Sequence, residues 1–258
     1  MSKVTLEQLL DAGVHFGHLK SKWDPNMAPY IFMEKNGIHV IDLYKTMKKM
    51  DDACGAIKNI AKSGRKVLFV ATKKQAKEIV IETANSVNMP YVTERWLGGM
   101  LTNFATVRKS IKKMQTIDKM EQDGTFGNMA KRERLTLTRE RDKLTRVLGG
   151  IQDLTRIPAA LFIIDVKKEH IAVAESHRLS LTSFAMVDTN SNPRLVDYAI
   201  PANDDSTKSI ELISSTLRDS IAEGLEERKR SKEEAKAKQD AKKKEKEKAA
   251  ESAEKAAE

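Results

Sequence analysis

The chain has 258 residues, a formal net charge of +9 and only 5% aromatic residues. It contains no apolar run long enough to span a membrane, no signal-peptide core at its N-terminus, and a single cysteine, Cys54, which excludes an internal disulfide. These features predict a cytosolic protein with an aliphatic core, and the excess of positive charge suits a polyanionic partner.

A short amphipathic helix is the first predicted element, because Thr5 can cap its start and Gly13 its end. The segment after it is predicted to be a loop, which carries His15, His18 and Trp23. Two histidines three positions apart can bind a metal, but no second cysteine and no nearby carboxylate pair accompany them. Structural hydrogen bonding or RNA contact is therefore favoured for this segment, with metal binding as the weaker alternative.

A β-hairpin is expected next, because Asn-Gly at 36–37 separates two apolar runs. A long helix over 43–62 leads to an apolar run at 66–71, of the kind found in strands that are buried on both faces of a sheet. A helix over 73–87 and a short strand at 90–92 follow. Strand, helix and strand at this spacing predict a βαβ unit in a parallel sheet.

Residues 93–104 (TERWLGGMLTNF) form a junction between this α/β pattern and a helical segment. In the junction, Arg95 and Trp96 offer a guanidinium and an indole, while Gly98 and Gly99 let backbone N–H groups approach a ligand closely. A hydrogen-bond donor, a flat ring and a bare backbone suit an RNA loop. The alternative is that Trp96 fills the core and the glycines only permit a sharp turn, and the residues alone leave both interpretations open.

Residues 104–148 predict an antiparallel helical hairpin that is inserted in the α/β domain and projects from it. Apolar residues recur every three or four positions in both halves, and Asp-Gly at 123–124 with Gly-Asn at 127–128 supplies the reversal. A charge run is usually a solvated helix face, but twelve basic residues against six acidic ones exceed what pairing along a helix can neutralise. The outward basic residues are therefore candidate RNA contacts. Those singled out are Arg108, Lys109, Lys112, Lys113, Arg132, Arg134, Arg139 and Arg141.

The α/β pattern resumes with buried strands at 160–166 and 184–187 and a last short strand at 198–200, with helices over 169–179 and 206–228. Asp165 and Asp188 sit at the carboxyl ends of two strands, where open α/β sheets bind ligands. This favours an alternative function as a nucleotide-binding α/β enzyme. Against it, the chain has no glycine-rich phosphate-binding loop, and acidic residues at strand ends also order turns.

We divide the chain into three parts. Residues 1–103 and 149–228 are predicted to form one α/β domain, the body, residues 104–148 are the inserted arm, and residues 229–258 are a charged tail. The tail contains no Val, Ile, Leu, Phe or Tyr, so no apolar burial offsets its chain entropy, and we expect disorder or a solvated single helix. A free RNA-remodelling protein that uses this tail is a further alternative.

Several stretches, in order over residues 4 to about 225, resemble the ribosomal protein S2 family of the bacterial small subunit. They include residues 12–18 (AGVHFGH), 27–32 (MAPYIF), 36–39 (NGIH), 95–104 (RWLGGMLTNF), 148–151 (LGGI), 187–190 (VDTN) and 200–205 (IPANDD). The resemblance implies a flavodoxin-like, Rossmann-like parallel sheet with helices on both faces and an inserted antiparallel coiled-coil hairpin. It implies a structural protein that is not an enzyme, needs no cofactor and forms no homo-oligomer.

The same resemblance implies the partners. They are small-subunit ribosomal RNA and neighbouring small-subunit proteins, among them protein S1, which recruits messenger RNA, and the place of action is the cytoplasmic ribosome. Carried onto this chain, the RNA-facing positions are Trp23, Arg95, Trp96, Asn103 and the basic residues of the arm.

Overall fold

The fold is built on a five-stranded parallel sheet, as the α/β prediction required. The computed structural model describes residues 4–124, 126 and 129–254, with residues 234–254 described by their backbone alone. The strand order across this sheet is β5-β4-β6-β7-β8, and every neighbouring pair is parallel. The strands are β4 (Val67–Val70), β5 (Tyr91–Val92), β6 (Ala160–Ile164), β7 (Thr182–Val187) and β8 (Tyr198–Pro201).

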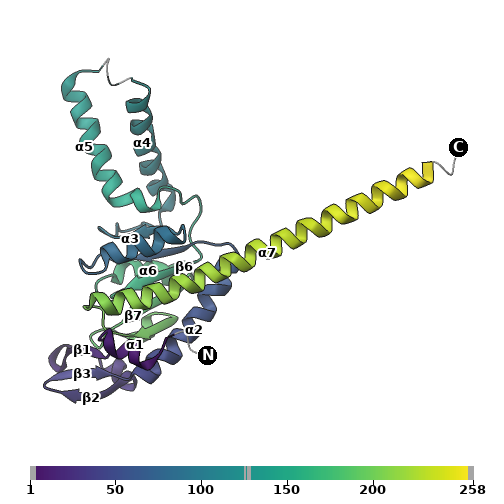
Figure 1. Ribbon diagram of the computed structural model, residues 1–258. Helices are drawn as coiled ribbons and strands as arrows, with labels where there is room; N and C mark the ends of the chain where they lie inside the picture. Colours follow the sequence, from purple (N-terminus) through teal and green to yellow (C-terminus); the bar gives the residue numbers. More distant parts are fainter. Residues whose placement is uncertain (1–3, 125, 127–128, 255–258) are drawn as a thin grey trace.

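Helices cover both faces of the sheet, which explains why β4 and β6 are apolar at every position (Figure 1). One face packs against α2 (Leu43–Lys62), α3 (Lys77–Ser86) and the first half of α7 (Thr207–Glu254). This core includes the fully buried rings of Phe69, Phe162 and Phe184, each of which contributes roughly 2–3 kcal/mol by its burial. The other face packs against α6 (His170–Arg178), the junction and the base of the arm.

A second, three-stranded antiparallel sheet of order β1-β3-β2 contains the predicted hairpin. Strands β2 (Ile31–Lys35) and β3 (Ile38–Ile41) are joined by Asn36 and Gly37, whose φ angles of 53° and 75° are those of the tight hairpin turn that Asn-Gly favours. The prediction of a loop before this hairpin is wrong in part, because residues 16–19 form strand β1 (Phe16–Leu19). Strand β1 exists because β3 supplies its hydrogen-bond partners, a long-range effect that local propensity does not show.

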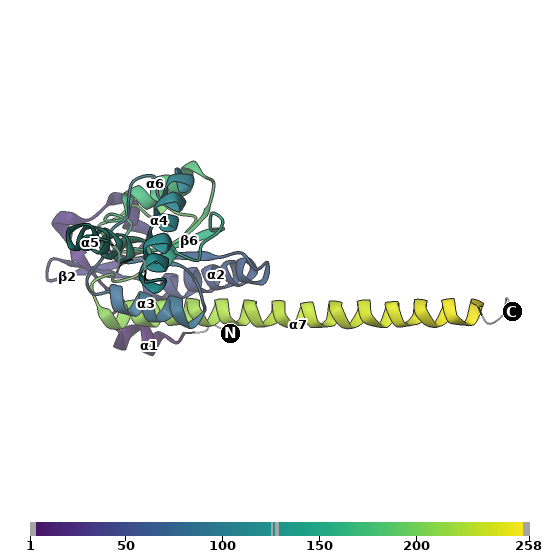
Figure 2. The same ribbon diagram turned by 90° about the horizontal axis from the view of Figure 1, so that it is seen from above.

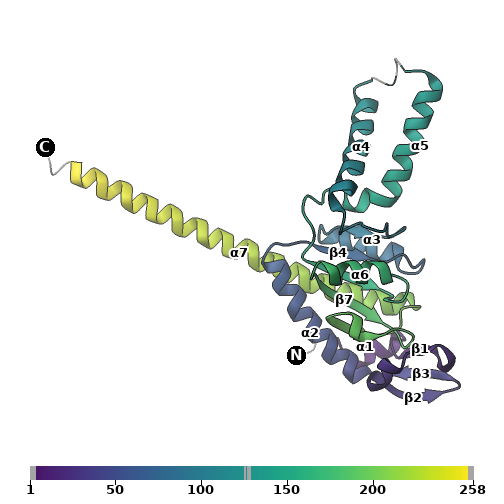
Figure 3. The ribbon, with the colours of Figure 1, turned by 180° about the vertical axis from the view of Figure 1, so that it is seen from behind.

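The arm consists of α4 (Phe104–Gln122) and α5 (Lys131–Leu148), which lie side by side and project from the body (Figure 3). Ile111, Met114 and Ile117 of α4 are buried, as the apolar period predicts. Gly124 has φ 71° and ends α4 at the predicted reversal, whereas Gly-Asn at 127–128 lies outside the described residues.

The N- and C-terminal helices differ sharply in length. The first, α1 (Leu6–Asp11), is capped by Thr5 as predicted, and Gln8 completes a capping box in which each of the two side chains bonds the other residue's backbone N–H. The last, α7, packs along α2 and then runs well beyond the body to Glu254 (Figure 2). Among the described residues, no helix is both long enough and apolar enough to cross a membrane.

Candidate nucleic-acid interface

A cluster of charged side chains gathers at the carboxyl ends of four parallel strands. The loops after β4, β6, β7 and β8 supply its members, and β1 adds one histidine. We call this set the strand-end cluster: Lys73, Asp165, Asp188, Asp204, Asp205 and His18. The Lys73 ammonium lies 2.8 Å from Oδ1 of Asp204 and 2.6 Å from Oδ1 of Asp205. His18 Nδ1 lies 2.9 Å from Oδ2 of Asp188.

Burial and mutual repulsion shape the electrostatics of this cluster. Burial first, and then the nearby carboxylates of Asp188 and Asp165, raise the pKa of Asp204 to about 7 against the opposing effect of Lys73. The hydrogen bond to Asp188 raises the pKa of His18, although burial opposes the effect. One lysine and one histidine thus share four carboxylates, and this corner of the body is acidic.

The strand-end cluster contains residues that the metal alternative and the enzyme alternative would use. His18, Asp188 and Asp204 could each offer one ligand atom to a cation, since these atoms lie within 4.8 Å of one another, whereas His15 is not part of the group. Asp165 and Asp188, the acids that the enzyme alternative would use, accept hydrogen bonds within their own turns. Asp165 accepts a hydrogen bond from the Lys168 N–H at 3.0 Å, and Asp188 accepts one from its neighbour's N–H at 2.5 Å. The turn-ordering alternative therefore describes these acids better than the catalytic one.

The junction does bind an anion, but the anion belongs to the chain itself. Glu175, on the inward face of α6, places its carboxylate among the junction's N–H groups. Its oxygens accept hydrogen bonds from the backbone N–H groups of Gly99 (2.8 Å), Leu101 (2.9 Å) and Thr102 (3.0 Å). Burial alone would raise the pKa of Glu175, but these bonds and that from Trp96 outweigh it and hold the pKa below its ordinary value.

The predicted RNA contact at Trp96 is corrected by the position of its side chain. Its indole N–H donates to Glu175 Oε1 at 3.0 Å, and the side chain is only 6% exposed, so its ring offers no face to a base. The core-filling alternative is the one found. Arg95 is exposed beside it, and Asn103 is exposed at the start of α4, where its Oδ1 accepts a bond from Thr106. Trp23 is 37% exposed and lies against His39, with 5.2 Å between ring centroids.

The eight basic residues of the arm that the sequence singles out fall into two groups. Three are engaged within the chain. The Lys113 ammonium pairs with Glu140 at 2.5 Å, Arg141 pairs with Asp142 at 3.0 Å and with Glu121, and the Arg108 guanidinium donates to the Thr155 carbonyl at 2.6 Å. Five others are exposed and have no ion pair among the described side chains. We call these the free arm cations: Lys109, Lys112, Arg132, Arg134 and Arg139.

Sequence reasoning missed Glu175 and Lys73. A carboxylate in the apolar run IAVAES of α6 is a signal that could have pointed to a buried anion and to a need for donors. Lys73 carried no such signal, because its partners Asp204 and Asp205 lie about 130 positions further along the chain.

Comparison with known proteins gives a consistent result. The family described as Ribosomal protein S2 matches residues 9–224. The small ribosomal subunit protein uS2 of Parabacteroides distasonis is 65% identical over 90% of this chain and 84% of its own length. The proteins of the same name from Phocaeicola vulgatus (64%, over 90% and 83%) and Bacteroides thetaiotaomicron (63%, over 90% and 84%) are similar to the same extent.

Proposed function

The chain belongs to the ribosomal protein S2 family, and on this premise we propose that it binds small-subunit ribosomal RNA through the free arm cations. Its relatives are proteins of the small ribosomal subunit, so its role is structural, within the ribosome, and the enzyme alternative is set aside. A free RNA-remodelling protein is likewise disfavoured by this membership.

The observation that carries the proposal is the contrast between paired and unpaired cations on the arm. Lys113 and Arg141 have acidic partners and so add little net field, whereas the free arm cations have none among the described side chains and remain exposed. Phosphates that such cations neutralise release condensed counterions, which is the main source of affinity for RNA backbones. Arg95, in the junction that precedes the arm, is exposed as well.

The finer features of the assignment are supported in different ways. Counted along the chain, the strands of the large sheet lie in the order second, first, third, fourth, fifth, which supports a flavodoxin-like topology. The paired helices α4 and α5 support a coiled-coil arm as a part distinct from the body. For docking of protein S1, support comes from Phe32 (70% exposed) and Met33 (48%) on β2, two exposed apolar side chains of the kind that protein partners cover.

The arm proposal predicts that reversing free cations prevents incorporation into small subunits. The test variant carries Lys109→Glu, Lys112→Glu, Arg132→Glu and Arg134→Glu, and its control carries the same change at four exposed body lysines without ion pairs among the described side chains, Lys35, Lys48, Lys74 and Lys208. We expect the arm variant to bind small subunits that lack this protein about a hundredfold more weakly, because four phosphates are no longer neutralised.

Sedimentation with those subunits measures the binding, and circular dichroism verifies the fold of both variants. An arm variant that sediments at wild-type stoichiometry would refute the arm as the RNA surface.

A further inference from the structure

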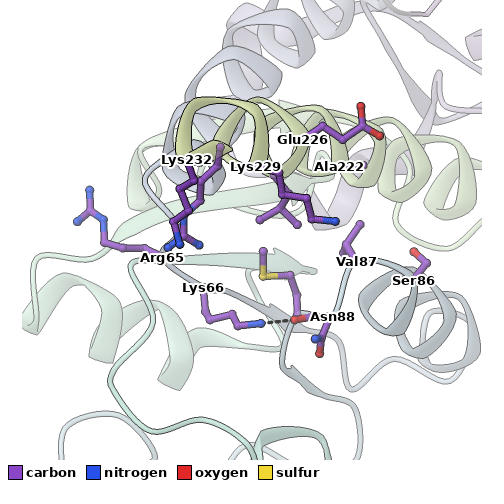
Figure 4. Close-up of a pocket in the computed structure, with 13 residues that line it drawn as sticks. Arg65, Lys66, Ser86, Val87, Asn88, Ala222, Glu226, Lys229 and Lys232 are labelled. Atoms are coloured by element: carbon purple, nitrogen blue, oxygen red, sulfur yellow. Dashed lines mark hydrogen bonds between the residues drawn. The ribbon is translucent and has the colours of Figure 1, made fainter. Parts of the chain in front are cut away.

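A second basic surface lies at the opposite edge of the sheet from the strand-end cluster. A pocket of about 550 Å³ opens where the amino ends of β4 and β5 meet the flank of α7. Figure 4 shows α7 along one side, with Lys229 and Lys232, and Arg65, Lys66 and Asn88 on the other. We call it the amino-edge pocket. Beyond the body, α7 runs in a different direction from the arm (Figure 1).

The position of α7 beside this pocket is fixed by a close contact with α2. A Cβ at Gly224 would lie 2.5 Å from the Lys58 carbonyl oxygen and 3.0 Å from the Ala61 Cβ, so only glycine permits this approach. The contact sets the rotation of α7 about its axis. As a result Leu225, Arg228, Lys229 and Lys232, spaced three and four apart, line the pocket on one face of the helix.

Cations are neutralised on one side of α7 and not on the other. Toward α2, Lys58 lies 2.7 Å from Glu227 and 3.3 Å from Glu223, and Lys62 lies 3.1 Å from Glu227. The pocket side carries five cations and one acid, Glu226. Of these cations Arg65, Arg228, Lys229 and Lys232 form no ion pair with any side chain that the structure describes.

Several of these cations are held in place by the fold. The guanidinium of Arg228 lies directly over Gly64, where a Cβ would collide with its Cζ. Arg65 donates from Nε to the Ser63 hydroxyl at 3.1 Å, which leaves its terminal nitrogens available. The Lys66 ammonium hydrogen-bonds the Asn88 carbonyl. Two positioned guanidinium groups present the paired donors that match phosphate oxygens.

We propose that the amino-edge pocket binds the sugar-phosphate backbone of ribosomal RNA as a second surface, independent of the arm. The inference rests on the proposed function in that RNA is taken as the polyanion. None of the lining residues is aromatic, so the pocket offers charge and hydrogen bonds rather than a stacking platform, and it grips the backbone without reading bases.

The test compares two triple variants of the full chain with equal loss of charge. The pocket variant carries Arg65→Gln, Arg228→Gln and Lys232→Gln, and spares Lys66 because it also supports the turn at Asn88. The control carries Lys35→Gln, Lys48→Gln and Lys74→Gln. The dissociation constant for small subunits that lack this protein is measured across a range of KCl concentrations.

We expect the pocket variant to bind at least about tenfold more weakly than the control near 0.1 M KCl. The slope of log affinity against log salt should be smaller in magnitude for the pocket variant by about two to three. This is roughly one unit for each phosphate that the variant no longer neutralises. An affinity and slope equal to those of the control overturn the inference. The arm variant is measured in the same assay. If only the arm variant binds more weakly, the pocket inference is wrong and the arm proposal stands. If only the pocket variant binds more weakly, the arm proposal is wrong and the pocket inference stands.

Photo-crosslinking identifies the partner. A full chain with Lys232→photoleucine is assembled into small subunits and irradiated, with Lys48→photoleucine as the matched control. Crosslinks from position 232 to ribosomal RNA, in excess of the control, support the inference. Crosslinks from that position to protein alone overturn it in favour of an acidic protein segment.

Discussion

At the scale of single residues, Glu175 shows how one buried charge organises a loop. A carboxylate that is 6% exposed is costly unless its oxygens accept hydrogen bonds. Here backbone N–H groups and the Trp96 indole donate them. The junction therefore takes its shape from an intramolecular anion. Its exposed residue Arg95 is left beside the base of the arm, where a partner could reach it.

Replacing this carboxylate by an amide should lower stability. Glu175→Gln keeps the shape but brings an N–H₂ group against backbone N–H donors, and we expect a loss of about 2–4 kcal/mol in the free energy of unfolding. Urea denaturation measures it. Glu78→Gln, at an exposed position of α3, is the control and should stay within about 0.5 kcal/mol of the wild type.

The difference in stability between the wild type and Glu175→Gln should depend on pH. Because hydrogen bonding holds the folded pKa of Glu175 below that of the unfolded chain, its stabilisation is present above the unfolded pKa and is lost as the pH falls through the folded pKa. The stability gap between wild type and Glu175→Gln should thus be full near pH 6 and shrink below about pH 4. A gap that widens on acidification would contradict the assignment of an ionised carboxylate.

At the scale of elements, the contact between α2 and α7 decides how two long helices share one face of the sheet. It is closer than most helix contacts because Gly224 has no side chain there. The ion pairs of Lys58 and Lys62 with Glu223 and Glu227 border the contact but are partly exposed, so they contribute little. Packing, rather than charge, holds the two helices together.

Two glycine-to-alanine substitutions should therefore change stability in opposite directions. At Gly55, in α2, an added Cβ meets nothing within 4 Å, so Gly55→Ala should raise stability by about 0.5–1 kcal/mol through helix propensity. Gly224→Ala should lower stability by about 1–3 kcal/mol, because the Cβ meets a carbonyl oxygen of the α2 backbone, which cannot rotate away. Thermal unfolding of both variants checks the signs, and stabilisation by Gly224→Ala would show that the helices can separate without cost.

At the scale of the whole molecule, the arm is attached through its base. Ile111 and Leu148 belong to the core that covers the second face of the sheet, whereas Met114 and Ile117 are buried outside that core. The outer part of the arm therefore adds little to the stability of the body. Its surface charge is left for interactions with a partner.

Shortening the arm should separate folding from assembly. The Lys113 Nζ lies 2.5 Å from Glu140 Oε1, so the two helices face each other at this level. A short glycine-serine linker can therefore replace residues 116–139. We expect the free energy of unfolding of this variant to stay within about 1 kcal/mol of the wild-type value, while incorporation into small subunits is abolished. Denaturant unfolding and sedimentation test the two halves of this prediction. A longer excision of 110–145 removes Ile111 from the core and should destabilise the body, and equal stability of both excisions would contradict the division drawn here.

The sequence by itself determined the features that repeat or turn locally. The hairpin at Asn36 and Gly37, the buried strands β4 and β6 and the apolar stripe of α4 follow from backbone conformation and side-chain period, which a short stretch encodes. Only the tertiary structure decided that residues 16–19 pair as a strand and that Trp96 turns inward to Glu175. It also decided which arm cations have acidic partners. Each of these outcomes depends on a through-space partner from another part of the chain, and no local pattern specifies where such a partner will lie.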